Sequence, residues 1–245
     1  VVQVHPAHSL RALRQSNDDR IPVDVPMRHD MGKAMPLTVL GATGGVGQHI
    51  VRHALADGHQ VTAVVRDAGR LSVRHENLSV LRADALDASS LNPVFEGADA
   101  VLSGIGAAGR RDPLKPASSS ARAAVKAMIA TGVRRIIVVS AGPLNRSGTG
   151  QSILSRRVFS PLLWAILRDT YTDLAVMEDV LRDSDLDWTS VRPSRLTNQP
   201  GLGRYRDTPD AGPAGNSIAR ADVARAMLDF VAAPQTYRRA IGVSR

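Results

Sequence analysis

The 245-residue sequence contains no cysteine, and this absence excludes several kinds of site at once. Without cysteine the chain cannot form disulfides, use a thiol as a nucleophile, or hold zinc or iron–sulfur clusters through sulfur ligands. Histidines occur near the start, at His5, His8 and His29, but their spacing does not match a metal site. We therefore expect no metal in this protein.

Aromatic residues are also scarce. They make up 3% of the chain, too few to build a stacking surface for single-stranded nucleic acid. The formal net charge is +8, yet lysine occurs only at Lys33, Lys115 and Lys126. A preference for arginine over lysine is explained equally well by the base composition of the genome and by adaptation to a negatively charged partner. Nucleic-acid binding is therefore disfavoured, and a small molecule is the expected partner.

The first 34 residues differ from the rest of the chain. Pro6, Pro22 and Pro26 interrupt them, and they show neither the period of a helix nor that of a strand. They also lack the basic and then apolar segments of a secretory signal, and no apolar run in the chain approaches the roughly 18 residues of a membrane span. We expect residues 1–34 to form a disordered or non-native extension, residues 35–245 to form the folded domain, and the protein to be cytoplasmic.

From residue 36 onward, short apolar runs alternate with segments of helical length. The runs are Leu37–Leu40, Val61–Val65, Leu78–Leu81, Ala100–Leu102, Ile136–Val139 and Trp188–Val191. The expected helices are 45–57, a short piece near 67–75, 88–96, 117–131, 155–184 and 220–232, with a last strand at 240–244. Strands that are apolar throughout are typical of a parallel sheet covered on both faces. The alternation predicts a single α/β domain with a doubly wound parallel sheet (Rossmann) in a three-layer α/β/α arrangement.

The most specific motif is a glycine-rich segment between the first predicted strand and the first predicted helix. Glycines at the spacing G-x-x-G-x-x-G permit a tight turn, let the backbone approach a diphosphate, and let the helix pack closely on the strand. The helix N-terminus then offers free N–H groups and partial positive charge. A glycine-rich turn without a ligand is the alternative; a P-loop is excluded because no Gly-Lys-Ser/Thr follows. The residues predicted to bind the cofactor here are Gly41, Thr43, Gly44, Gly45, Val46 and Gly47.

The end of the second predicted strand bears on the choice of cofactor. An NAD site usually carries an acid there, which accepts from the ribose 2′-hydroxyl. Here the strand runs into Arg66, with Arg70 one helical turn further. A guanidinium suits a 2′-phosphate, so we expect NADP(H) to be preferred over NAD(H). Asp67 leaves the NAD alternative open, because it could serve as the ribose ligand.

Two further strand ends are expected to line the same crevice, because ligands bind at the carboxyl ends of strands in open α/β sheets. Asp84 could accept from an adenine amino group, with Ala85 beside the ring. Ser103, Gly104 and Ile105 follow the fourth predicted strand, where small residues let the backbone pass near the adenosine ribose.

Several segments together carry a resemblance to a known family. They are Gly41–Gly47, Val65–Asp67, Asp84–Ala85, Val138–Ser140, Met177–Pro193, Leu196–Tyr205 and Ile218–Ala224. These segments resemble the NmrA-like group of atypical short-chain dehydrogenases, and within it most closely the NADPH-dependent flavin reductase (biliverdin-IXβ reductase) branch. The resemblance covers roughly residues 36–245. It implies a single Rossmann domain, NADP(H) binding, and hydride transfer to a flat acceptor such as a flavin, a quinone or a linear tetrapyrrole.

The sequence departs from the wider group where proton transfer is concerned. Ordinary short-chain dehydrogenases use Tyr-x-x-x-Lys, but here Ala175 stands four residues after Tyr171, and no lysine follows Lys126. Flavin reductase relatives present histidines near the acceptor, where this chain has Leu174 and Arg195. Alcohol dehydrogenase and sugar epimerase chemistry are therefore disfavoured.

The remaining catalytic candidate is Ser140, at the end of the fifth predicted strand. We expect no base beside it, so that its hydroxyl hydrogen-bonds the nicotinamide carboxamide or the acceptor; a serine that merely ends a strand is an equal alternative. The resemblance implies that Pro193 closes the nicotinamide pocket. Arg195 is available to an anionic acceptor, and Tyr171 is the other predicted substrate contact.

Two functions fit these residues: a reductase of flavin-like acceptors, and a dinucleotide-sensing regulator without turnover. The acceptor pocket is expected from loops near 107–116, 143–155 and 195–215. An apolar patch between Val158 and Leu167 is interpreted as core or as the surface of a homodimer rather than as an acceptor lid.

Overall fold

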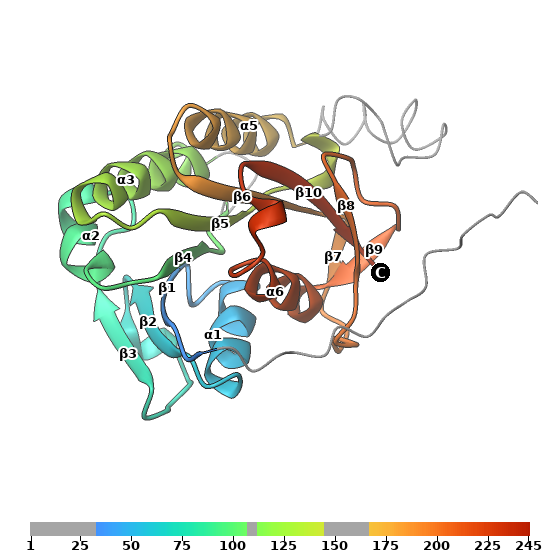
Figure 1. Ribbon diagram of the computed structural model, residues 1–245. Coiled ribbons are helices and arrows are strands. Elements are labelled where there is room, and N and C mark those ends of the chain that lie inside the picture. Colours follow the sequence, from blue (N-terminus) through green and yellow to red (C-terminus); the bar gives the residue numbers. More distant parts are fainter. Residues whose placement is uncertain (1–32, 107–111, 145–166) are drawn as a thin grey trace, which may run out of the picture. The chain divides into compact units, whose positions relative to one another are not determined.

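The computed structural model describes residues 33–106, 112–144 and 167–245, which all belong to one compact unit, Met31–Arg245. Within these residues an eight-stranded sheet has the order β3-β2-β1-β4-β5-β6-β10-β8 (Figure 1). Every pairing is parallel except that of β8 with β10. The strands are β1 Pro36–Leu40, β2 Gln60–Val65, β3 Leu78–Arg82, β4 Ala100–Ser103, β5 Arg135–Val139, β6 Asp187–Pro193, β8 Arg206–Pro209 and β10 Arg239–Ser244.

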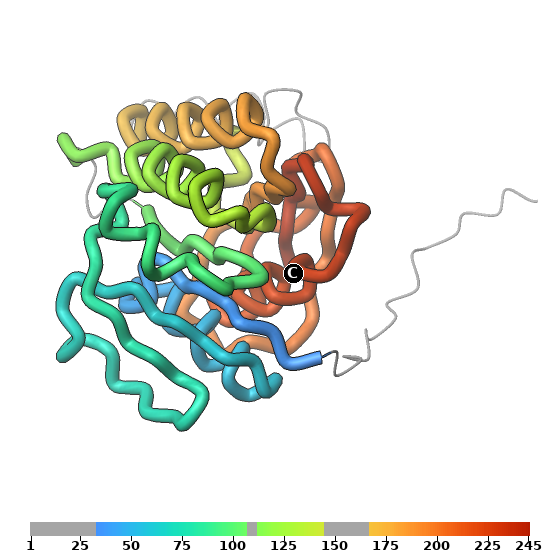
Figure 2. The backbone as a smooth tube through the Cα atoms, turned by 60° about the vertical axis from the view of Figure 1, so that its left-hand side comes forward, coloured from blue at the N-terminus to red at the C-terminus, as the bar shows by residue number. Residues whose placement is uncertain are grey.

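Helices cover both faces of the sheet (Figures 1 and 2). One face packs against α1 (Gly47–Ala56) and α6 (Arg220–Asp229), which lie side by side. The other packs against α2 (Ala88–Phe95), α3 (Pro116–Thr131) and α5 (Arg168–Arg182). This arrangement confirms the doubly wound, three-layer fold that the alternation of strands and helices predicts.

The central strands explain why the apolar runs are continuous. Along β5, Ile136 and Val138 pack against the α2, α3 and α5 side, whereas Ile137 and Val139 pack against the α1 and α6 side. Both orientations are buried from Ile136 to Val139, so these four positions are all apolar.

The prediction that the run Leu78–Leu81 is buried on both faces is wrong. It forms β3 at the edge of the sheet, and the side chain of Leu81 is 41% exposed. The predicted helical piece near 67–75 is only the single turn Ala68–Arg70 (η1), so no helix follows β2 to cover β3. An edge strand without a covering helix keeps one side in water.

The carboxyl-terminal part contains strands that the sequence pattern did not predict. β8 has the polar sequence Arg-Asp-Thr-Pro, and β7 (Arg195–Thr197) pairs with β9 (Ser217–Ala219) over three residues each. The predicted helix 155–184 is described from Arg168 to Arg182, and its first part, with most of the apolar patch, lies outside the described residues. The last predicted helix ends earlier, at Asp229, and the last predicted strand is β10.

Among the described residues, none of the helices has the length and apolar character needed to cross a membrane.

Candidate nucleotide site and the buried glutamate beside it

The turn between β1 and α1 brings the carboxyl ends of β1 and β4 into close contact. Gly41 has φ +69°, a conformation that side chains disfavour. A Cβ on Gly41 would stand 2.9 Å from Cγ1 of Ile105 and 3.1 Å from the carbonyl carbon of Gly104. Both the backbone angle and the space therefore require glycine at this position.

The rest of the loop is equally tight. The N–H of Gly44 donates to the carbonyl of Gly41 at 2.8 Å, and this bond closes the turn. A Cβ on Gly47 would lie 2.1 Å from the same carbonyl oxygen, so α1 begins in direct contact with the end of β1. The contact at Gly47 is the close packing of helix on strand that the motif predicts.

The start of α1 has the character of an anion site. The N–H groups of Gly45, Val46 and Gly47 donate to no acceptor within the part of the chain that the structure describes. The first turn of α1 holds no acidic residue, and Val46 at the N-cap position supplies no side-chain cap. The carbonyl of Thr43 is engaged by the Gln48 amide at 3.0 Å, which steadies the loop. Free N–H groups at a helix start and the helix dipole both favour a phosphate.

At the end of β2, the structure separates the two residues that compete for the ribose. Asp67 accepts the N–H of Gly69 at 3.0 Å and thereby starts the η1 turn. Arg66 is exposed and makes no hydrogen bond or ion pair with any other described residue. Its guanidinium is thus the freer of the two groups.

The predicted adenine and ribose contacts follow β3 and β4, at the same edge of the sheet. Asp84 accepts the N–H of Leu86 at 2.9 Å in a turn, with Ala85 between them. Ser103 is buried and its hydroxyl lies 3.4 Å from the N–H of Ile105, while Gly104 donates to the carbonyl of Leu40 at 3.0 Å. These contacts place the end of β4 against the glycine loop, whereas the turn after β3 is separated from β1 by β2.

The expectation that no base lies beside Ser140 is wrong. The Ser140 hydroxyl donates to Oε1 of Glu178, in α5, at 2.8 Å. The same oxygen accepts from the hydroxyl of Ser190 at 2.7 Å and from Nε of Arg192 at 2.9 Å, both in β6. Oε2 of Glu178 accepts from Nη2 of Arg192 at 2.5 Å. The contact was not predicted because Glu178 lies 38 residues from Ser140 and reaches it only when α5 packs on the sheet.

Glu178 is 4% exposed, and its hydrogen bonds decide its charge. Burial alone would raise the pKa of this carboxyl, but the hydrogen bonds and charge of Arg192, with the hydroxyls of Ser190 and Ser140, outweigh burial and leave the pKa below its usual value. A carboxylate held ionised in this way is a weak base. It orients the Ser140 hydroxyl, whose oxygen keeps its capacity to accept a further hydrogen bond.

The predicted acceptor contacts differ in accessibility. Tyr171, in the first turn of α5, is 6% exposed in the apolar cluster with Leu174, and burial raises the pKa of its hydroxyl. Pro193 is buried at the end of β6, and Arg195 is exposed at the start of β7. Little of the Tyr171 side chain is therefore available to an acceptor, whereas Arg195 is accessible.

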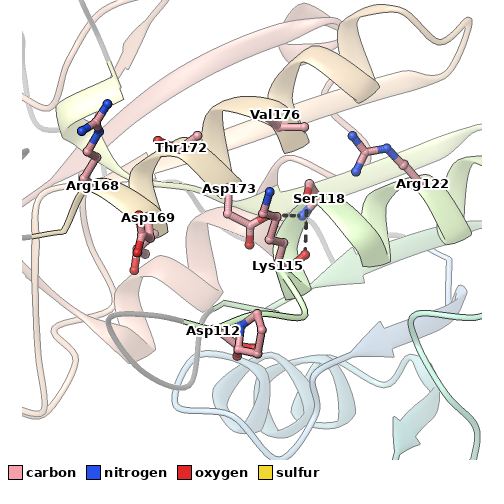
Figure 3. Close-up of a pocket in the computed structure, with 11 residues that line it drawn as sticks. Asp112, Lys115, Ser118, Arg122, Arg168, Asp169, Thr172, Asp173 and Val176 are labelled. Carbon is pink, nitrogen blue, oxygen red and sulfur yellow. Dashed lines mark hydrogen bonds between the residues drawn. The ribbon is translucent and has the colours of Figure 1, made fainter.

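A hollow of about 720 Å³ opens between the N-terminal parts of α3 and α5 (Figure 3). Within it Asp173 accepts the N–H groups of Ala117 and Ser118 at 3.0 Å each, so a carboxylate of α5 caps the start of α3. Part of its wall belongs to the predicted acceptor loop near 107–116, whose residues 107–111 lie outside the described part, as do residues 145–155 of the second loop. The lining residues are Asp112, Pro113, Lys115, Ser118, Arg122, Arg168, Asp169, Thr170, Thr172, Asp173 and Val176.

Neither Tyr171 nor Arg195 is among the described residues that line this hollow, so the structure does not bring the predicted acceptor contacts together there. No group of three or more potential metal ligands occurs in residues 33–106, 112–144 and 167–245.

A parallel sheet whose first strand ends in a closed glycine turn at a helix start defines a Rossmann-type nucleotide-binding domain. The comparison with family models makes the class more specific: the chain belongs to the NAD(P)H-binding family, whose model matches residues 41–234.

Individual relatives agree with this assignment. The uncharacterised protein YwnB of Bacillus subtilis is 27% identical over 210 residues, which is 82% of this chain and 94% of the relative. A Streptococcus pneumoniae protein of solved structure, provisionally named an NADH-flavin reductase, is 25% identical with a TM-score of 0.69, over 86% of this chain and 99% of that one. A short-chain dehydrogenase/reductase of Veillonella parvula in complex with NADP is 23% identical with a TM-score of 0.72, over 87% and 95% of the two chains, and supports the fold alone. With the family match, these findings confirm the resemblance to the atypical short-chain dehydrogenases.

Proposed function

We propose that the protein is an NADPH-dependent reductase that passes a hydride to a flavin-, quinone- or tetrapyrrole-like acceptor. The observation that carries this proposal is the glycine turn at Gly41–Gly47, where the N–H groups of Gly45, Val46 and Gly47 have no acceptor among the described residues and neighbouring atoms leave no room for side chains at Gly45 and Gly47. The family match and the provisionally named flavin reductase relative support it.

Each group of residues at the carboxyl edge of the sheet would bind a different part of the dinucleotide. The N–H groups of Gly45, Val46 and Gly47 would hold the diphosphate, and Arg66 a 2′-phosphate. The turns at Asp84–Ala85 and Ser103–Ile105 would contact adenine and its ribose, and Pro193 would close the nicotinamide side.

In this reaction the protein would mainly orient the cofactor and the acceptor for hydride transfer. A bound reduced nicotinamide would supply the hydride. Ser140, held by Glu178 at 2.8 Å, would accept a hydrogen bond from the nicotinamide carboxamide and fix the ring. The chain lacks the Tyr-x-x-x-Lys pair, so acceptors that take their proton from water are favoured. Arg195 would meet a phosphate or carboxylate on such an acceptor.

Oxidation of NADPH tests this proposal. The purified protein is expected to oxidise NADPH, followed at 340 nm, when FMN, riboflavin or a quinone is added, and Ser140→Ala is expected to slow turnover about tenfold, because ring orientation is lost. Tight NADPH binding without oxidation across the acceptors would instead support a dinucleotide-sensing regulator. The missing Tyr/Lys pair is the feature that favours this second candidate.

The preference for NADP(H) has its own test. Replacing Arg66 by glutamine is expected to weaken NADP⁺ binding about tenfold and to leave NAD⁺ binding unchanged, because one charge-assisted contact to the 2′-phosphate is lost. Titration calorimetry with both dinucleotides measures the ratio. Arg74→Gln, which removes the same charge from an exposed position further along the chain, is the matched control. An equal loss for both dinucleotides, or none for either, would contradict the role of Arg66.

A further inference from the structure

The first residue of α6 lies on the glycine loop. Arg220 belongs to the helix that packs beside α1 on the same face of the sheet (Figure 1). A Cβ built on Gly45 would lie 2.8 Å from Nε of Arg220 and 2.9 Å from its Cδ. The arginine side chain therefore covers Gly45 directly, and only a residue without a side chain at position 45 admits it there.

The guanidinium is fixed by a neutral partner. Nη1 of Arg220 donates to the amide oxygen of Asn198 at 2.5 Å, and no carboxylate among the described residues makes a hydrogen bond or ion pair with it. The nearest acid along the helix, Asp222, is buried and accepts the N–H groups of Leu202 and Gly203 at 2.9 Å each. The positive charge of Arg220 is thus held in place without being neutralised.

This charge acts on the start of α1. The pKa of His49, in the first turn of that helix, is lowered by burial and further by the charges of His53, Arg52 and Arg220. The same turn contains no acid, and its leading N–H groups are unengaged. Backbone dipoles and a side-chain cation therefore converge on one place, the surface of the glycine loop at Gly45.

We propose that Arg220 is a cofactor-binding residue that contacts the diphosphate of the dinucleotide. The proposal rests on the proposed nucleotide site and adds to it a side chain from the carboxyl-terminal part of the chain. A guanidinium that retains free N–H donors beside a loop of free backbone N–H groups suits a diphosphate, which carries oxygens enough for both. The diphosphate is common to NAD and NADP, so Arg220 contributes to binding of both and not to the choice between them.

The test compares ligands that differ in the diphosphate. Arg220→Gln is expected to lower the affinities for NADP⁺, NAD⁺ and ADP by the same factor of about ten. The affinity for 2′-AMP, which has no diphosphate, is expected to stay unchanged. Arg66→Gln is expected to lower the affinities for NADP⁺ and 2′-AMP, which carry the 2′-phosphate, and to leave those for NAD⁺ and ADP unchanged. Arg220→Lys, which keeps the charge, is expected to recover part of the affinity. Arg52→Gln on the exposed side of α1 is the matched control for charge alone.

A second route does not alter Arg220. Gly45→Ala is expected to displace the arginine side chain, since its Cβ would meet Nε at 2.8 Å. The double variant, Gly45→Ala with Arg220→Gln, is then expected to bind dinucleotide no more weakly than Arg220→Gln alone. Additive losses of affinity would mean that the alanine acts on the ligand directly, and they would count against this contact. Thermal melts report whether each variant is folded.

The outcomes separate the two proposals. Dinucleotide binding that is unchanged in folded Arg220→Gln, or reduced for NADP⁺ alone, would overturn the role of Arg220 and leave the nucleotide site intact. A wild-type protein that binds neither dinucleotide would overturn the proposed function, and the role of Arg220 with it.

Discussion

Replacing Gly44 by leucine is expected to abolish dinucleotide binding, with a loss of affinity of at least about 100-fold, while the protein remains folded. A Cβ at this position would stand 3.1 Å from the carbonyl oxygen of Gly41 and 3.7 Å from that of Gly104. A side chain here would therefore start at the carboxyl ends of β1 and β4, and leucine would reach the place where we propose that the diphosphate binds. Fluorescence titration with NADPH measures the effect.

The matched control is the same substitution at the opposite edge of the sheet. Gly97 precedes β4, has φ +75°, and no atom lies within 4 Å of the position that its Cβ would take. Gly97→Leu is expected to cost about 1 kcal/mol of stability through backbone strain and to bind NADPH like the wild type. Undiminished binding by folded Gly44→Leu would remove the basis for placing the nucleotide on this loop.

The second large effect concerns stability. Glu178→Gln is expected to lower the free energy of unfolding by about 4 kcal/mol, because the neutral amide leaves the buried guanidinium of Arg192 without its counter-charge. Arg192 donates through both Nε and Nη2 to this carboxylate, and its side chain is 12% exposed. Urea unfolding, followed by circular dichroism, measures the change. Asp179→Asn removes the same charge from a side chain that is 62% exposed, and is expected to change stability by less than about 0.5 kcal/mol.

The effect of pH follows from the direction of the Glu178 pKa shift. The pKa is depressed in the folded protein, so the stabilisation by this group is complete above the usual carboxyl value of 4.5 and is lost as pH falls below it, when the unfolded chain takes up the proton first. The glutamine variant is expected to lack this part of the acid sensitivity. Equal acid sensitivity in the two proteins, or an unfolding free energy within 1 kcal/mol of the wild type, would contradict the ion-pair argument.

The same network bears on function. Ser140 is fixed by Glu178, so a serine at a strand end becomes a group of defined orientation beside the proposed nicotinamide pocket. Its hydroxyl proton points to a carboxylate with a lowered pKa, which is a poor base. This arrangement suits the orientation of a cofactor better than proton transfer, in agreement with acceptors that require only a hydride from the site.

The amino-acid sequence alone determined the fold and the position of the glycine loop. Strands such as Ile136–Val139 are buried on both faces and must be apolar at every position, and this leaves a local signal that a reader of the sequence can use. The glycine loop also leaves a local signal, because the contact between Gly47 and the carbonyl of Gly41 joins residues only six positions apart in the sequence.

Only the tertiary structure decided which distant residues meet at the site. Glu178 reaches Ser140 because α5 packs on β5 and β6, and Arg220 reaches Gly45 because α6 packs beside α1. It also decided that β3, apolar in sequence, lies at an exposed edge. Contacts of this kind depend on how whole helices and strands pack. The sequence around a residue therefore does not predict which distant side chain it will contact.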